Sequence, residues 1–165
     1  QLARELNIRF EGESIWVNGS DVAADIRTEA CGMGASRVSA VPAVRAALTD
    51  VQHAFAQLPG LVADGRDMGT VIFPQAPLKV FLTASAQERA QRRYKQLISK
   101  GISARIEDLL SDLEARDARD TQRSVAPLKP AQDARLLDNS ALGIDESVTL
   151  VLSWWNGLFG SRQLR

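Results

Sequence analysis

The chain has 165 residues, 45% of them hydrophobic and 24% charged, which fits a single globular domain with a buried core. Lys plus Arg and Asp plus Glu both number 20, so no net charge favours a nucleic acid or an anionic membrane, and an anion site would need a local group of arginines. One cysteine, Cys31, excludes an internal disulfide framework and fits a reducing cytoplasm, one histidine argues against a zinc site, and no apolar run approaches membrane-spanning length.

The first third of the chain predicts a small antiparallel excursion followed by a helix. Residues 7–18 alternate as strands do, with a turn at 11–13 and a second turn signal at Asn18-Gly19. The glycines of residues 32–34 favour a flexible or helical segment over a dinucleotide loop. Residues 42–58 predict a helix, because apolar side chains recur every three or four positions between Pro42 and Pro59.

The central stretch is residues 61–70. Its apolar run, residues 61–63, predicts a short buried parallel strand, and Asp64, Arg66 and Asp67 follow it at once. Ligand sites of parallel sheets lie beyond the carboxyl ends of the strands, and a guanidinium suits a phosphate there. The alternative is a turn with a local Arg–Asp pair.

The remaining pattern alternates strands and helices. Strands are predicted at residues 78–82 and 134–137, and helices at about 86–100, 106–123 and from 144 onwards. Arg89 and Arg93 lie one turn apart, and Arg116 and Arg123 lie on one stripe of the third helix. These arginines suit either a solvated helix face or a mobile arm that closes on an anion.

This order of elements predicts an α/β fold of three layers around a parallel sheet. Its ligand is then expected at the carboxyl edge of the sheet, where arginines from later helices can also reach. The residues alone therefore predict a protein that binds a phosphorylated small molecule. Trp154 and Trp155 predict a docking face on the last helix, with an exposed patch for a partner as the alternative.

Several motifs in register resemble those of bacterial cytidylate kinases, over residues 6–150. They are Ile26-Arg27-Thr28-Glu29, Ser36 with Val41-Pro42-x-Val44-Arg45, Asp64-Gly65-Arg66-Asp67-Met68-Gly69-Thr70-Val71-Ile72-Phe73-Pro74, Glu88-Arg89-Ala90-x-Arg92-Arg93, and Arg116-Asp117-x-Arg119-Asp120-x-x-Arg123 with Ala126-Pro127-Leu128. The resemblance implies transfer of the ATP γ-phosphoryl group to CMP or dCMP, with Mg²⁺. It also implies a P-loop nucleoside monophosphate kinase fold with a small antiparallel insert that binds the monophosphate.

The resemblance also implies roles for individual residues. The cytosine-reading positions correspond to Ser36, Arg45, Asp67 and Arg123. Asp120 and Arg116 correspond to the family's residues that contact the sugar and the neighbouring phosphate. Arg66 corresponds to an arginine that binds a phosphate, and Asp64 to a carboxylate near the reacting phosphates and the metal. Arg89 and Arg93 resemble residues that clamp ATP, Arg27 and Thr28 are further site candidates in the insert, and no residue is assigned as a metal ligand.

One departure affects what is expected of these 165 residues. The family begins with a strand and a Gly-x-x-x-x-Gly-Lys-[Ser/Thr] phosphate loop, and the sequence contains no such motif. We therefore expect residues 1–165 to form a single truncated kinase domain of low stability and little activity. Its expected parts are an insert at 7–45, a core at 46–88 and 124–165, and a lid region at 89–123.

Three other functions remain open at this stage. They are a CMP-binding remnant without catalysis, a kinase for another monophosphate such as UMP, and a nucleic-acid-binding module that uses the arginines. The zero net charge and the 5% aromatic content argue against the last of these. The expected setting is a cytoplasmic monomer that acts on small molecules, with no nucleic acid and no membrane partner.

Overall fold

The computed structural model describes residues 5–160, and its backbone divides into two compact units. The first unit runs up to Met68 and includes Arg119–Leu128, and the second consists of Gly69–Ala118 and the chain from Lys129 onwards. The expected division into insert, core and lid stays a prediction. No helix within residues 5–160 is long and apolar enough to cross a lipid bilayer.

The first unit opens with the predicted antiparallel excursion. Strands β1 (Ile8–Glu11), β2 (Ser14–Val17) and β3 (Ser20–Asp21) pair in the order β1-β2-β3, so this prediction is confirmed. The turn signal at Asn18-Gly19 connects β2 to β3. Both residues have a left-handed backbone, with φ of 50° and 85°, which suits a tight hairpin turn.

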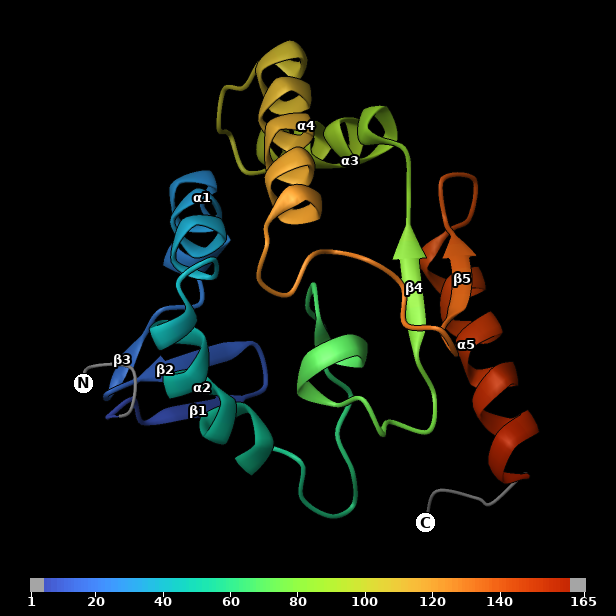
Figure 1. The fold of residues 1–165 in the computed structure, drawn as a ribbon. Helices are drawn as coiled ribbons and strands as arrows, with labels where there is room; N and C mark the ends of the chain where they lie inside the picture. Colours follow the sequence, from blue (N-terminus) through green and yellow to red (C-terminus); the bar gives the residue numbers. More distant parts are fainter. Residues whose placement is uncertain (1–4, 161–165) are drawn as a thin grey trace. The chain divides into compact units, whose positions relative to one another are not determined.

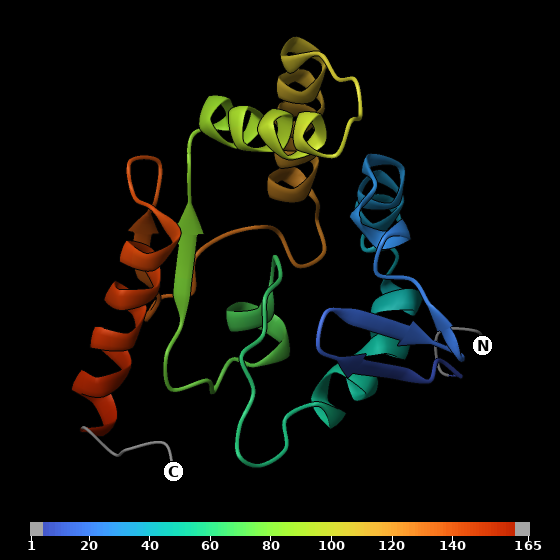
Figure 2. The same ribbon diagram turned by 180° about the vertical axis from the view of Figure 1, so that it is seen from behind.

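Helix α2 (Pro42–Ala54) lies over one face of this small sheet in both views (Figure 1 and Figure 2). Phe55, which ends α2, packs edge-on against Phe10 of β1 with 5.4 Å between ring centroids. The helix stops four residues before the predicted end at residue 58. Phe55 already ends the helix, and Leu58, the last residue of the apolar pattern, is 96% exposed.

Residues 25–38 form helices, as the small-residue segment indicated. A short 3₁₀ turn, η2 (Asp25–Arg27), leads into α1 (Glu29–Val38). Thr28 caps α1, since its hydroxyl oxygen accepts a hydrogen bond from the Cys31 N–H at 3.2 Å.

The strand predicted at residues 61–63 is wrong. These residues form no strand, and Val62 is fully exposed. A strand requires a neighbour that takes up its backbone hydrogen bonds, and the paired strands within residues 5–160 are β1-β2-β3 and β4-β5 only. The chain instead forms one π-helical turn at η3 (Met68–Ile72), which no sequence pattern indicated.

The second unit contains a parallel strand pair. β4 (Val80–Thr83) and β5 (Arg135–Asp138) pair with Val80 opposite Arg135, close to the predicted ranges. Leu137 of β5 is 4% exposed and belongs to the small core of this unit. The α/β class and the parallel pairing are confirmed, whereas the three-layer arrangement stays a prediction.

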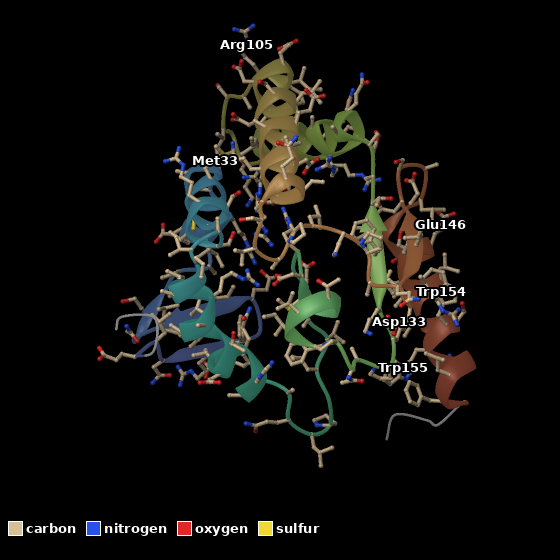
Figure 3. All side chains as sticks on the ribbon, in the orientation of Figure 1. Met33, Arg105, Asp133, Glu146, Trp154 and Trp155 are labelled. Carbon is tan, nitrogen blue, oxygen red and sulfur yellow. The ribbon has the colours of Figure 1, made fainter. Side chains whose placement is uncertain are left out.

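The helices α3 (Ala86–Ser99), α4 (Ile106–Gln122) and α5 (Ile144–Phe159) match their predicted positions. Helix α5 runs beside β4 and β5 in both views (Figure 1 and Figure 2). Figure 3 labels Trp154 and Trp155 on this helix. Arg135 of β5 lies over the Trp154 ring at 5.3 Å, so Trp154 belongs to the predicted docking face, whereas Trp155 and Phe159 pack on each other and are exposed.

Candidate functional site: a buried arginine–carboxylate cluster

The first unit buries a carboxylate between two guanidinium groups. Asp67 is 6% exposed and is the last residue of the irregular segment that connects α2 to η3. Arg45 of α2 donates from Nη2 to Asp67 Oδ2, and Arg123 Nη2 lies 4.0 Å from Asp67 Oδ1. Three segments that are far apart in the sequence therefore meet at one carboxylate.

A second buried carboxylate, Asp120, lies near the end of α4 and is 2% exposed. Its Oδ1 accepts a hydrogen bond from the Ser36 hydroxyl at 2.9 Å, and its Oδ2 accepts one from Arg66 Nε at 3.1 Å. Ser36 itself is 8% exposed and belongs to α1. These bonds connect α1, the segment before η3 and the end of α4.

The guanidinium of Arg123 is held at two of its three nitrogens. Its Nε donates to the Ala126 carbonyl at 2.6 Å and its Nη1 donates to the Ser39 hydroxyl at 2.9 Å. Ala126 has a φ of 49°, an unfavourable backbone conformation for alanine that directs its carbonyl toward this guanidinium. Nη2 is buried and has no hydrogen-bond partner among the described residues.

The charges of this cluster favour a ligand that accepts hydrogen bonds. Three guanidinium groups (Arg45, Arg66 and Arg123) accompany two carboxylates (Asp67 and Asp120), so the positive charge is in excess. A buried donor without an acceptor costs free energy unless a ligand supplies one. The cluster can therefore present both a carboxylate acceptor and a guanidinium donor to a polar ligand.

Not every residue expected at the site belongs to this cluster. Asp64 is exposed on the loop before Arg66. Thr28 is used as the cap of α1, and Arg27 is exposed at the end of η2. Their predicted roles toward a nucleotide stay predictions.

The other expected arginines belong to the second unit. Arg89 Nη1 donates to Asp117 Oδ1 at 3.1 Å, and a second, parallel bond completes a bidentate pair between α3 and α4. Arg93 is half-buried in the same helix as Arg89, and its Nη1 donates to the Gln96 side chain at 3.1 Å. Arg116 is half-buried on α4.

Sequence reasoning missed two members of the cluster. Ser39 and the Ala126 carbonyl both hold Arg123, and no motif contained Ser39. Ser39 comes three residues after Ser36, so the two serines share one face of the helical segment, and this spacing was the signal available. The Ala126 carbonyl is a backbone group, which no side-chain pattern reveals.

A parallel strand pair with flanking helices and a buried guanidinium–carboxylate cluster defines an α/β protein with a site for a polar, anion-bearing ligand. The sequence model of one family, described as Cytidylate kinase, matches residues 1–156. The chain belongs to the cytidylate kinase family, and it is thereby a member of the kinases.

Individual relatives are similar over nearly the whole chain. The cytidylate kinase of Cupriavidus necator is 59% identical over 155 residues, which cover 94% of this chain and 70% of that protein. The cytidylate kinase of Ralstonia pickettii is 58% identical over 163 residues, or 99% of this chain and 71% of that protein. The cytidylate kinase of Bordetella bronchiseptica is 57% identical over 154 residues, or 93% and 69% of the two chains.

Proposed function

We propose that this protein transfers the γ-phosphoryl group of ATP to CMP or dCMP and forms the corresponding diphosphate. The observation that carries the proposal is the buried Arg123 Nη2, a donor without an acceptor, 4.0 Å from the Asp67 carboxylate. This pair offers a donor and an acceptor side by side, which is the pattern required by one edge of cytosine. The names and the high identity of the relatives support the same reaction.

The chemistry of the two pyrimidines explains the preference for cytosine. Cytosine presents an amino donor next to an unprotonated ring nitrogen, whereas uracil presents a carbonyl next to a ring N–H. The Asp67 carboxylate accepts a hydrogen bond from the amino group, and the Arg123 guanidinium donates to the ring nitrogen or the neighbouring carbonyl. Uracil would place its carbonyl oxygen against a buried carboxylate, and such an unpaired acceptor is rejected strongly.

The remaining residues are assigned to positioning and charge neutralisation. Phosphoryl transfer needs little covalent participation by the protein and depends on alignment and on compensation of the phosphate charge. We assign Ser36 and Arg45 to the base, Asp120 and Arg116 to the sugar and the adjacent phosphate, and Arg66 to the acceptor phosphate. In the ATP site and the insert we place Arg89, Arg93, Arg27 and Thr28.

Asp64 fits a Mg²⁺ ion that arrives with ATP. No group of three or more His, Cys, Asp or Glu side chains among the described residues could hold a metal by itself. Mg²⁺ in kinases is bound by one or two carboxylates together with substrate phosphates and water, so one exposed carboxylate meets this need. When bound, the ion would neutralise charge on the transferred phosphate.

The proposed setting is a cytoplasmic monomer that acts on nucleotides without a nucleic acid or membrane partner. The zero net charge supports the last part of this proposal, because no global field attracts a nucleic acid or an anionic membrane.

The test measures binding and turnover separately. Calorimetric titrations of the chain with CMP, dCMP, UMP and AMP are expected to show tightest binding of a cytosine nucleotide. ADP release with ATP, Mg²⁺ and CMP then reports phosphoryl transfer. A chain that binds UMP or AMP as tightly as CMP would overturn the assignment of the substrate, and CMP binding without any CDP formation would assign the chain as a CMP-binding protein instead.

A further inference from the structure

Ser39 contacts both arginines that face Asp67. It caps the carboxyl end of α1, and its hydroxyl accepts a hydrogen bond from Arg123 Nη1 at 2.9 Å. Its own backbone carbonyl accepts a bond from Arg45 Nη1 at 3.3 Å. One residue at a helix end therefore binds two guanidinium groups that come from α2 and from the segment after α4.

The hydrogen bonds of the Ser39 hydroxyl are mutually consistent. Its one proton is donated to the Ser36 carbonyl at 2.9 Å, which leaves the oxygen lone pairs for Arg123. The carboxyl end of a helix also carries partial negative charge, which favours nearby cations. Ser39 thus offers the guanidinium groups an oriented acceptor in a favourable field.

These contacts determine the direction of the free donor. A guanidinium is planar, so two fixed nitrogens also fix the third. Arg123 is held at Nε by the Ala126 carbonyl and at Nη1 by Ser39, and this leaves Nη2 to point beside Asp67. Without the Ser39 hydroxyl, the guanidinium would keep one hydrogen bond, at Nε, and the 4.0 Å ion pair with Asp67, and its orientation would be less restricted.

We propose that Ser39 is a positioning residue for substrate selection, which holds Arg123 and Arg45 in the geometry that distinguishes cytosine from uracil. The proposal rests on the proposed function, since it assigns Ser39 to the same base-reading cluster. Ser39 does not touch the nucleotide. It acts through the two arginines, and pre-organises them before the ligand binds.

The first test compares Ser39→Ala with Ser39→Thr in calorimetric titrations with CMP and UMP. Ser39→Ala is expected to weaken CMP binding about tenfold, the scale of one hydrogen bond to a charged group. It is also expected to lower the ratio of CMP affinity to UMP affinity, which we call the CMP/UMP ratio. Ser39→Thr keeps the hydroxyl and is expected to restore both values. Unchanged CMP binding by Ser39→Ala, or an equal loss for CMP and UMP, would overturn the proposal.

Ser99→Ala provides the matched control. Ser99 ends α3, and its hydroxyl donates to the Gln96 carbonyl at 2.9 Å, which repeats the local bond of Ser39 to Ser36. Within residues 5–160, no arginine donates a hydrogen bond to the Ser99 hydroxyl. Loss of this hydroxyl is therefore expected to leave the ratio of CMP affinity to UMP affinity unchanged. A ratio that narrows equally in Ser99→Ala would assign the effect to helix ends in general and overturn the proposal.

A double substitution distinguishes positioning from a purely structural role. If Ser39 acts through Arg123, then Ser39→Ala in an Arg123→Ala background is expected to cause no further loss of CMP affinity. A full additional tenfold loss would overturn the proposal. If Ser39→Ala does not fold, Ser39→Cys preserves the volume with a weaker acceptor, and an unchanged CMP/UMP ratio in that variant would overturn it as well. Wild-type protein that binds no CMP would instead refute the proposed function itself.

Discussion

The substitution Asp67→Asn tests the central element of the site. It preserves the size of the side chain and one oxygen acceptor, but removes the negative charge between Arg45 and Arg123. The side chains of Asp67, Arg45 and Arg123 are 8%, 15% and 7% exposed, so water cannot easily replace the lost carboxylate. Two guanidinium groups would remain buried without an anionic partner.

The expected cost follows from this burial. Removing one partner of a buried ion pair typically costs 3–5 kcal/mol, and because asparagine keeps one acceptor we expect about 3 kcal/mol of unfolding free energy to be lost. The amino group of CMP would lose its hydrogen bond to a charged acceptor, which corresponds to about 1.5–3 kcal/mol, or a roughly 10- to 150-fold loss of CMP affinity. UMP is affected less, since an asparagine amide can donate to the uracil carbonyl.

Urea denaturation followed by tryptophan fluorescence measures the stability, and titrations with CMP and UMP measure the preference. Asp112→Asn is the control, because Asp112 is an exposed carboxylate on α4 and its loss is expected to change the unfolding free energy by less than about 0.5 kcal/mol. Wild-type stability together with a wild-type CMP/UMP ratio in Asp67→Asn would refute the reasoning.

Three further substitutions probe features outside this ion pair. Asp120→Ala is expected to lower the unfolding free energy by about 2 kcal/mol in urea, because a buried serine hydroxyl loses its acceptor, and an unchanged value would contradict the observed bond. Ser85→Ala removes the cap of α3 and is expected to cost about 1 kcal/mol in the same assay. Its control is Ser111→Ala at an exposed position, which should change the unfolding free energy by less than about 0.5 kcal/mol. An equal loss of stability in Ser85→Ala and Ser111→Ala would exclude loss of the cap as the cause. The pKa of Asp138 lies below its usual 3.8 because the Ser140 hydroxyl and then the Ser140 N–H donate to it, so Ser140→Ala should raise that pKa in an NMR titration. The stability due to this shift is present above pH 3.8 and is lost as the pH falls through the folded-state pKa, so the difference between variant and wild type should vanish in strong acid.

The local elements were predictable because their causes lie within a few residues of sequence. Ser85 caps α3 by accepting a bond from a backbone N–H three residues later, and Asn18-Gly19 supports a turn through its own backbone preferences. Such interactions involve neighbours in the chain, so a pattern of residues is sufficient to identify them. The boundary of α2 was less accurate because the apolar pattern continues to residue 58, whereas the helix ends at Ala54 and Leu58 finds no burial.

The sequence by itself determined the residue types of the site and, through several motifs in register, the family to which the chain belongs. Only the tertiary structure decided that Asp67 pairs with Arg45 and that Asp120 accepts a bond from Ser36, 84 residues away. It also decided that residues 61–63 form no strand. Strand pairing and contacts between distant side chains depend on which segments become neighbours in space, and no local pattern encodes that choice.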